Sequence, residues 1–337
     1  MTDLSLSYIV PVFNTRPYLV RCLRSIVDQG LSPDSYEVLV VDDGSTDGSK
    51  ASVQSFIDEG HPQVRLFTQE SSGVSMARNL ALDHARGRYV QFVDSDDFLV
   101  GSKMAALLDQ ALEHDLDVLV FNYNRADEAG HIVDAAAGAD VGTPVVATGV
   151  EYLSCHSMTP YIWRYLIRRD LLERDKSRFD QSLIVCEDGE LIARFMLQSQ
   201  RVMGNNASPY CYVTRGDSAM NSTDITHLQR RIFSQIDSAI AIDETIKRYK
   251  SATGNDVPAS VSGLRNLYLY FSMTKALTCG LAAEAISRMR DAGLYPFPCI
   301  GPEADYHGVK WSVLHRMMMR PALWCGLSKL YCNLKKK

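Results

Sequence analysis

Four apolar runs alternate with helix-like segments over the first hundred residues, and this alternation limits the fold more than any other feature of the chain. The runs span residues 6–13, 37–41, 64–68 and 89–93. Between them, apolar residues recur at helical spacing after Pro17, and two more helix starts follow the turn at 44–48 and Gly73. Strands that alternate with helices predict a doubly wound, mostly parallel α/β sheet.

The fourth run leads directly into three acids, Asp94, Asp96 and Asp97, with Ser95 among them. Carboxylates this close repel one another and raise one another's pKa, and a hard divalent cation such as Mg²⁺ or Mn²⁺ relieves that repulsion. The alternative is a loop whose acids cap the next helix. Because ligands bind beyond the carboxyl ends of parallel strands, the sequence predicts that this cluster lines a binding crevice.

The ends of the first two runs reach the same edge of the predicted sheet. They supply six further candidate ligand-binding residues, namely Pro11, Val12, Phe13, Asn14, Asp42 and Asp43. The segment after Gly73 carries Arg78 and is predicted to be a helix that stops at Gly87 in a left-handed conformation.

Composition indicates an ordinary globular protein. Of the 337 residues, 46% are hydrophobic and 22% are charged. No uninterrupted apolar run reaches about 18 residues, so we expect no membrane-spanning helix. The chain begins without a basic and apolar leader, which favours a cytoplasmic location. The eight cysteines are scattered without a Cys-x-x-Cys pair, which argues against a zinc site.

The pattern becomes mixed beyond residue 100 and helical beyond residue 223. Glu187 and Asp188 open a helix, where acids also favour the helix dipole, so their presence has a sufficient structural reason. A strand-like run ends at Arg215, before a polar loop. We expect a first domain over residues 1–223, with halves 1–100 and 101–223, and a helical region over residues 224–337.

These residues resemble the family 2 glycosyltransferases, inverting enzymes with the GT-A fold that use nucleotide-activated sugars. The resemblance covers about residues 5–221. Its five motifs are Ser-Tyr-Ile-Val-Pro-Val-Phe-Asn from position 7, Val-Val-Asp-Asp-Gly-Ser-Thr-Asp-Gly-Ser from 40, Gly-Val-Ser-Met-Ala-Arg-Asn-Leu-Ala-Leu from 73, Tyr-Val-Gln-Phe-Val-Asp-Ser-Asp-Asp-Phe-Leu from 89, and Glu-Asp at 187. Each is weak alone, and five in order are highly specific. They imply a Rossmann-like GT-A sheet, followed here by a C-terminal helical extension.

The resemblance implies a nucleotide-sugar site, and family habit favours UDP. In such enzymes an Asp after the second strand bonds the uracil ring; Asp43 matches that position, Asp42 is a close competitor, and residues 11–13 flank the base. The stretch from Asp94 to Asp96 resembles the DxD motif. There the last Asp binds Mn²⁺ or Mg²⁺ on the diphosphate, and the first approaches the ribose or sugar.

Inverting transfer also needs a carboxylate that takes the proton of the acceptor hydroxyl. Asp188 matches that general base, and Glu187 is the second choice. Arg78 is expected to face the nucleotide or sugar, with a surface or salt-bridging Arg as the alternative. Arg215 is expected to reach the diphosphate when its loop closes, with a solvated loop Arg as the alternative.

Aromatic residues at Tyr161, Trp163 and Tyr165 suit an acceptor sugar, although core packing explains them equally well. The Gln-x-x-Arg-Trp signature of processive members is missing from the sequence, so we expect transfer of one sugar per encounter. The expected acceptor is a glycan, or a polyprenyl-linked glycan if the C-terminal tail binds a membrane, in cell-surface polysaccharide synthesis.

The last 32 residues, 306–337, contain seven Lys or Arg and no acid. Two basic amphipathic helices with tryptophans suit an anionic membrane surface, at the inner face of the plasma membrane. A packed helical cap with a solvated Lys tail is the alternative. Nucleic acid is an unsuitable partner, because the net charge of the whole chain is −5 and the basic tail is short.

Two other functions fit part of the pattern. A sugar-nucleotide nucleotidyltransferase has a related sheet, but it needs a Gly-rich basic loop after the first strand, where this chain has Val-Phe-Asn-Thr-Arg-Pro-Tyr at 12–18. The other is a nucleotide-binding module without turnover.

Overall fold

A computed structural model describes residues 4–137, 141–142, 144–174, 176–216, 225–298 and 309–335. The chain forms two compact units whose segments interleave along the sequence. The first comprises residues 1–152, 161–181 and 198–216, and the second comprises residues 153–160, 182–197 and 217–337. The boundary expected at residue 223 lies outside the described residues.

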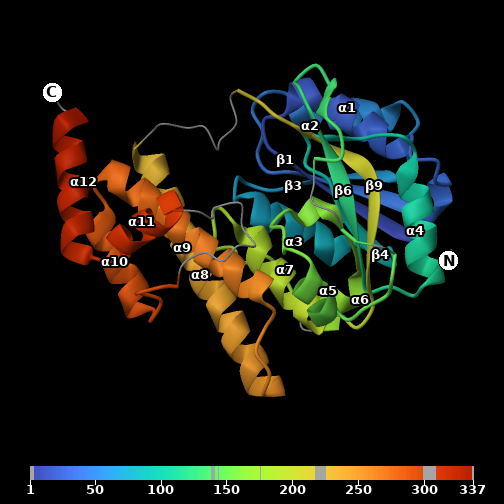
Figure 1. The fold of residues 1–337 in the computed structure, drawn as a ribbon. Coiled ribbons are helices and arrows are strands. Elements are labelled where there is room, and N and C mark those ends of the chain that lie inside the picture. The colour runs from blue at the N-terminus through green and yellow to red at the C-terminus, as the bar shows by residue number, and fades with distance from the viewer. Residues whose placement is uncertain are drawn as a thin grey trace. The chain divides into compact units, whose positions relative to one another are not determined.

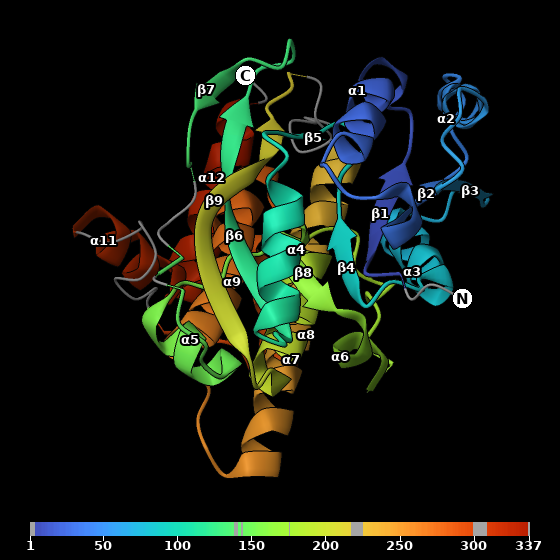
Figure 2. The ribbon, with the colours of Figure 1, turned by 90° about the vertical axis from the view of Figure 1, so that its right-hand side faces the viewer.

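The first unit is built on one sheet, in which the described residues form nine strands (Figures 1 and 2). Their order is β3-β2-β1-β4-β8-β6-β9-β5, with β7 paired to β6. The strands are β1 Leu6–Val12, β2 Tyr36–Asp42, β3 Val64–Thr68, β4 Tyr89–Phe92, β5 Phe98–Leu99, β6 Val118–Ala126, β7 Ile132–Asp134, β8 Tyr165–Arg168 and β9 Val202–Val213. The first four strands and the β6–β9 pair are parallel, and β8 joins these two groups with antiparallel pairing on both sides. The predicted mostly parallel α/β sheet is confirmed.

Helices cover both faces of this sheet. Those of the first unit are α1 Arg16–Val27, α2 Ser49–Asp58, α3 Val74–His84, α4 Lys103–Glu113 and α6 Arg169–Arg174, with short 3-10 turns at Pro33–Ser35 and Ile162–Arg164. Apolar residues of α1, α2 and α4 share one core with alternate residues of β1, while α3 packs below β1 and β2 in Figure 1. Burial on both faces explains why every residue of β1 is buried.

Gly87 shows that a glycine can be required for space rather than for its backbone angle. The helix α3 ends at His84, and Gly87 is not among the residues with positive φ, so the left-handed cap predicted there is wrong. A Cβ atom at this position would lie 2.4 Å from the backbone of Leu6 and Ser7. The turn into β4 therefore runs too close to β1 for any side chain.

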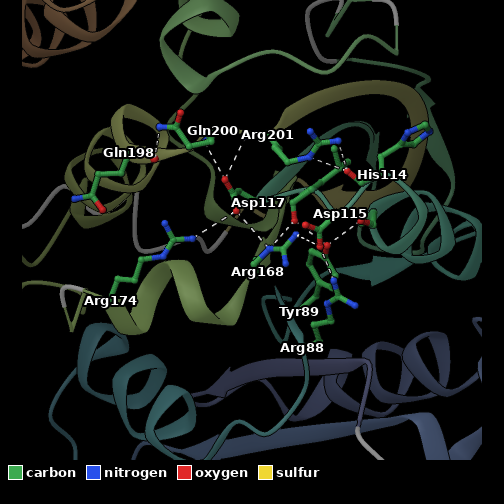
Figure 3. Close-up of polar contacts among 12 residues, drawn as sticks. Arg88, Tyr89, His114, Asp115, Asp117, Arg168, Arg174, Gln198, Gln200 and Arg201 are labelled. Carbon is green, nitrogen blue, oxygen red and sulfur yellow. Dashed lines mark hydrogen bonds and ion pairs between the residues drawn. The ribbon is translucent and has the colours of Figure 1, made fainter.

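Ion pairs hold together the amino edge of the sheet, where the parallel strands begin (Figure 3). Asp117, which precedes β6, accepts hydrogen bonds from the backbone N–H groups of Gln200 and Arg201 and lies 3.4 Å from the Arg168 guanidinium. Asp115 pairs with Arg168 at 2.8 Å and with Arg88 at 2.6 Å. These bonds connect the starts of β4, β6 and β9 with the end of β8.

Glu37, near the start of β2, makes a second polar cluster at the same edge. Its buried carboxylate accepts hydrogen bonds from the Ser7 hydroxyl and from the guanidinium groups of Arg65 and Arg86. Burial works to raise the pKa of Glu37, but these bonds outweigh it and leave the pKa below its ordinary value. The carboxylate therefore stays ionised inside the protein.

The second unit is helical, as expected for the C-terminal region. It contains α7 Glu187–Gln198 up to residue 197, α8 Ile225–Thr253, α9 Ala259–Cys279, α10 Ala282–Asp291, α11 Val309–Met318 and α12 Pro321–Lys335, while α5 Gly149–Cys155 is shared with the first unit. The helix α9 packs against α8, α10 and α12. Within the described residues, no helix combines the length and apolar character needed to cross a bilayer.

Gly189, in the first turn of α7, is in close contact with α9. A Cβ atom there would lie 2.6 Å from the Tyr268 hydroxyl oxygen and 3.1 Å from a Leu264 methyl carbon. The Glu-Asp-Gly-Glu sequence at 187–190 therefore needs its glycine so that the start of α7 can lie against α9.

Candidate functional site

The loops that follow β1, β2 and β4 meet at the carboxyl edge of the sheet. The Thr15 hydroxyl donates to the Ser95 hydroxyl oxygen at 2.9 Å, which joins the β1 loop to the acid turn after β4. The backbone N–H of Asn14 donates to the Ser45 hydroxyl oxygen at 3.0 Å, and that of Thr46 donates to the Asn14 side chain at 2.9 Å. Asn14 adopts φ 52°, a left-handed conformation that Asn tolerates, and so turns the chain toward the β2 loop. The expected meeting of these strand ends is thus present.

Asp42 and Asp43, at the end of β2, are both buried but have different partners. Asp43 accepts hydrogen bonds from Gln69 at 2.7 Å and from the backbone N–H groups of Ser72 and Gly73 at 2.7 and 2.9 Å. It thereby anchors the turn before α3. One oxygen of Asp42 accepts a long bond from the Ser45 N–H, 3.3 Å, and the other has no hydrogen-bond partner among the described residues. Such an orphaned buried acceptor calls for an explanation, and a ligand donor is one.

Pro11, Val12 and Phe13 end β1 beside these carboxylates. Pro11 and Val12 are buried, whereas Phe13 is 52% exposed. The Phe13 ring is thus the part of this segment that is open to a ligand, while its two neighbours belong to the sheet.

The acid turn after β4 is held by arginines from two other elements. Arg78, buried on α3, contacts an Asp94 oxygen at 2.9 Å and lies over the ring of Phe179. Arg215, just after β9, contacts an Asp96 oxygen at 2.9 Å and lies over the ring of Tyr18. The two arginines singled out from the sequence are therefore both paired with the predicted DxD carboxylates. The polar loop expected to close after Arg215 lies outside the described residues from position 217.

Asp97 is the member of this acid cluster to which the sequence assigned no separate role. It is fully buried, bonded to the Tyr210 hydroxyl at 2.7 Å and to the Val213 N–H at 2.7 Å. Burial, together with the charges of Asp96 and Asp94, raises the pKa of Asp97 well above its ordinary value. The Tyr210 oxygen also accepts the Asp94 N–H at 3.1 Å. Asp97 and Tyr210 thus fix the acid turn to β9.

The turn offers a divalent cation two partly exposed carboxylates, Asp94 and Asp96. No group of three or more His, Cys, Asp or Glu residues suited to a metal occurs in the described part of the chain. Mg²⁺ bound in nucleotide sites usually takes one or two carboxylates together with substrate phosphates and water. The donor set therefore fits a cation shared with a diphosphate, and it does not fit a cage made by protein alone.

The candidate bases Glu187 and Asp188 lie in the second unit, in the first turn of α7. Glu187 is buried, whereas Asp188 is partly exposed. The residue before them, Cys186, has φ 63°, so the chain turns sharply as it enters the helix. Of the two carboxylates, Asp188 is the one more accessible to solvent.

The three aromatic residues considered for an acceptor differ in exposure. Trp163 and Tyr165 are buried, and Tyr161 is exposed. The Trp163 ring stacks on that of Tyr210 with centroids 4.3 Å apart. Core packing therefore accounts for Trp163 and Tyr165, and only Tyr161 presents a ring to solvent.

Comparison with known proteins adds to this geometry. Residues 7–135 match the family model described as glycosyl transferase family 2. Over 209 residues the chain is 28% identical to the uncharacterized glycosyltransferase EpsJ of Bacillus subtilis, covering 61% of this chain and 60% of EpsJ. It is 27% identical over 240 residues to the poly(ribitol-phosphate) beta-N-acetylglucosaminyltransferase TarS of Staphylococcus aureus, covering 70% of this chain and 40% of TarS. The chain thus spans less than two thirds of each of these relatives.

Solved structures show the same fold. The crystal structure of S. aureus TarS 1-349 aligns with a TM-score of 0.63 over 98% of this chain and 92% of that one, at 18% identity. A structure of the same fragment in complex with UDP-GlcNAc aligns with a TM-score of 0.58 at 19% identity. The mannosyltransferase PcManGT of Pyrobaculum calidifontis, in complex with GDP-Man and Mn²⁺, aligns with a TM-score of 0.51 at 16% identity, covering 98% of this chain and 88% of that one. With the five motifs and the GT-A sheet, the match identifies residues 7–135 of this chain as a glycosyl transferase family 2 sequence.

Proposed function

We propose that the chain transfers one sugar, with inversion, from a UDP-sugar to a hydroxyl group of a glycan or polyprenyl-linked glycan in cell-surface polysaccharide synthesis. The observation that carries the proposal is the pairing of Asp94 with Arg78 and of Asp96 with Arg215 at the carboxyl edge of the sheet. Carboxylates for a cation and guanidinium groups for phosphate oxygens are the two kinds of group that a sugar diphosphate requires. The complex of TarS with UDP-GlcNAc supports a UDP-sugar donor.

The nucleoside would lie over the ends of β1 and β2. Phe13 offers an exposed ring for the base, and the orphaned oxygen of Asp42 would accept a hydrogen bond from the uracil N–H. Asp43 already accepts three hydrogen bonds that anchor the turn before α3. We therefore assign uracil recognition to Asp42 and retain Asp43 as its support, which reverses the order of preference drawn from the sequence.

Asp96 and Asp94 would hold Mn²⁺ or Mg²⁺ together with the diphosphate. The cation, when bound, would neutralise charge on the departing UDP. Arg215 would turn from Asp96 toward the diphosphate, because its guanidinium binds phosphate oxygens as well as carboxylate oxygens. Arg78 would keep the Asp94 carboxylate oriented, since it is buried between that carboxylate and the Phe179 ring.

Asp188 would take the proton of the acceptor hydroxyl as the hydroxyl oxygen attacks the anomeric carbon. One carboxylate is enough for inversion, and no covalent enzyme intermediate forms. The partial exposure of Asp188, against the burial of Glu187, supports this order of preference.

The test is slow hydrolysis of UDP-sugars by the intact chain. With Mn²⁺ and UDP-GlcNAc, UDP-glucose or UDP-galactose, we expect UDP release that Asp188→Asn lowers about 100-fold. Glu187→Gln is the matched control and should leave most of the rate. Equal rates in all three proteins would reject Asp188 as the base.

The same assay separates the two other functions. A nucleotide-binding module would show a UDP-dependent rise in melting temperature without UDP release from any donor. A nucleotidyltransferase would release pyrophosphate from UTP and a sugar 1-phosphate. Either result would overturn the proposed transfer.

A second surface points to an anionic membrane as the place of action. On α12, the side chains of Leu323, Leu330 and Leu334 are exposed along one side of the helix, and Arg316, Arg320 and Lys329 are exposed nearby in the sequence. Trp324 is buried, as the alternative of a packed helical cap requires, and Trp311 has no described side-chain environment. Each cation near an anionic bilayer contributes about 1 kcal/mol to binding.

Vesicle flotation tests this surface. The full chain should float with phosphatidylglycerol vesicles and remain unbound with phosphatidylcholine vesicles. A triple variant in which Arg316, Arg320 and Lys329 are each replaced by Glu should no longer float with the vesicles. Equal binding of the full chain to both kinds of vesicle would contradict the electrostatic part of the proposal.

A further inference from the structure

Five aromatic rings form one cluster beside the acid turn. The Trp163 ring stacks on Tyr210 at 4.3 Å and 6°, and on Tyr161 at 5.2 Å and 9°. The Tyr212 ring lies 6.0 Å from Trp163 and within 14° of parallel, and Tyr123 meets Trp163 edge-on at 4.9 Å. Three tyrosine rings, those of Tyr161, Tyr210 and Tyr212, are therefore nearly parallel to the Trp163 indole.

The inner rings of this cluster are covered and two outer rings are not. Trp163 is 4% exposed, whereas Tyr161 is 42% and Tyr212 is 38% exposed. A single exposed aromatic ring is common in proteins. Two exposed rings fixed by a shared buried support make a rigid apolar surface, and aromatic surfaces with a few polar groups are typical of small-ligand sites. Arg125, exposed on β6, supplies such a polar group beside Tyr123 and Tyr161.

The cluster is bonded directly to the proposed metal-binding turn. Tyr210, which stacks on Trp163, donates its hydroxyl proton to Asp97 and accepts the Asp94 N–H. Tyr212 lies two residues further along the same strand, so its side chain is on the same face of β9 as Tyr210. Burial raises the pKa of Tyr212, and the charges of Asp97 and Asp96 add to that rise. The exposed Tyr212 ring therefore lies near the acid turn.

Sheet order separates this surface from the proposed nucleoside site. In the sheet, β4 lies between β1 and β8 (Figure 2). The Phe13 ring and Asp42 belong to β1 and β2 on one side, whereas the aromatic cluster belongs to β6, β9 and the turn before β8 on the other. A diphosphate bound at the end of β4 would have the base on one side and the aromatic surface on the other.

We propose that Tyr161 and Tyr212 bind a pyranose ring of the acceptor glycan, and that Trp163 and Tyr210 hold these two rings in position. The apolar C–H face of a sugar packs on an aromatic ring, and Arg125 would donate hydrogen bonds to the hydroxyl groups of that sugar. The inference rests on the proposed sugar transfer and names the acceptor side of the same site.

Saturation-transfer NMR with the intact chain, UDP and Mn²⁺ tests this subsite. The probes are methyl glycosides of glucose, galactose, mannose and N-acetylglucosamine. At least one glycoside should receive saturation from the wild-type protein. Tyr161→Ala and Tyr212→Ala should each weaken its affinity about fivefold, while Tyr161→Phe and Tyr212→Phe should keep it within about twofold.

Tyr331→Ala is the matched control, because Tyr331 is also 38% exposed but lies on α12 of the second unit. It should leave glycoside binding unchanged. Melting with and without UDP and Mn²⁺ checks each variant for folding and donor binding. If UDP raises the melting temperature but no glycoside binds, or if both Ala variants bind as the wild type does, the subsite is rejected alone. If UDP gives no rise, the proposed donor site fails instead.

Discussion

Both edges of the sheet contain acidic residues, but the two edges differ in how completely the carboxylates are neutralised by neighbouring groups. At the amino edge, each carboxylate faces arginines and N–H groups: Asp115 pairs with Arg88 and Arg168, and a hydrogen bond from Arg168 lowers the pKa of Asp115 (Figure 3). At the carboxyl edge, Asp94 and Asp96 pair with Arg78 and Arg215, but the buried Asp97 beside them is bonded to a hydroxyl and an N–H group, and burial together with the charges of Asp96 and Asp94 raises its pKa.

This difference separates stability from function. The amino-edge clusters lower the energy of the folded chain by themselves, because every charge has its partner within the protein. At the carboxyl edge, Asp94 and Asp96 repel the buried Asp97 even though each has an arginine partner, and one Asp42 oxygen has no hydrogen-bond partner among the described residues. Such an arrangement is costly unless a ligand completes it, which is typical of sites where perturbed pKa values cluster.

The largest expected effect comes from Asp96→Asn at the carboxyl edge. Removing this carboxylate should lower UDP-sugar turnover by about 100-fold to 1,000-fold, because the charge developing on UDP would lose its stabilisation. The Mn²⁺-dependent part of the rise in melting temperature with UDP should also vanish. Asp115→Asn, at the amino edge, is the control and should leave turnover within about twofold; a similar loss in both would erase the distinction between the edges.

Glu37→Gln should be the most damaging change at the amino edge. It should lower the free energy of unfolding by about 2 kcal/mol at pH 7, because the buried carboxylate loses its charge and with it its ion pairs. The two arginines are partly exposed, which keeps the effect from being larger. The folded-state pKa of Glu37 is lowered, so this stability is present above the unfolded value of about 4.3 and is lost as pH falls below it.

Urea unfolding of the wild type and Glu37→Gln at pH 7, 5 and 3.5 measures this effect. The gap between the two proteins should be full at pH 7 and should narrow at pH 3.5. A gap that grows in acid would show that the sign of the pKa shift is wrong.

Tyr210→Phe links the two kinds of effect. The variant removes the hydroxyl that bonds Asp97 and the Asp94 N–H and keeps the ring against Trp163. We expect a loss of about 1–2 kcal/mol in the free energy of unfolding and roughly a tenfold fall in turnover, because buried groups lose a partner and the acid turn loosens. Chemical denaturation and steady-state kinetics are the measurements; unchanged kinetics with lowered stability would leave Tyr210 a structural residue only.

Asp42→Asn should have the smallest effect. Because one Asp42 oxygen has no hydrogen-bond partner within the described part of the chain, the change should leave the melting temperature nearly unaltered and weaken UDP binding by about fivefold to tenfold. Asp43→Asn should instead lower the melting temperature, since it disturbs three hydrogen bonds to the turn before α3. Isothermal titration with UDP and thermal melting compare them, and the reverse pattern would return uracil recognition to Asp43.

The sequence was most informative where neighbours in the sheet are close in the chain. The runs at 6–13, 37–41, 64–68 and 89–93 became β1 to β4, and their motifs placed Asp94 and Asp96 in one turn. Long-range contacts could not be predicted from the sequence. The Asp97 carboxyl is held by hydrogen bonds from Tyr210 and Val213, which lie more than a hundred residues away. The only local signal was a further acid in the run and a Tyr-x-Tyr pattern at 210–212.

Burial was likewise beyond the reach of pattern reasoning. A tryptophan in the sequence fits an exposed sugar or lipid contact as well as a core position, yet Trp163 and Trp324 are both buried, and Trp163 stacks on Tyr210 from a strand distant in sequence. The sequence also did not predict that α7 groups with the helical unit. The need for glycine at position 189 comes from the nearby Tyr268 hydroxyl on α9, a contact that no local pattern indicates.

One side chain, that of Tyr210, joins the turn proposed for the cation to the support of the rings proposed for the acceptor: its hydroxyl bonds the Asp94 N–H and Asp97, and its ring stacks on Trp163. Any displacement of that turn on nucleotide capture would be transmitted to the stacked rings through two hydrogen bonds. By thermodynamic linkage, if the first substrate changes the affinity for the second by some factor, the second must change the affinity for the first by the same factor. Cooperativity between the two substrates would then depend on one hydroxyl group.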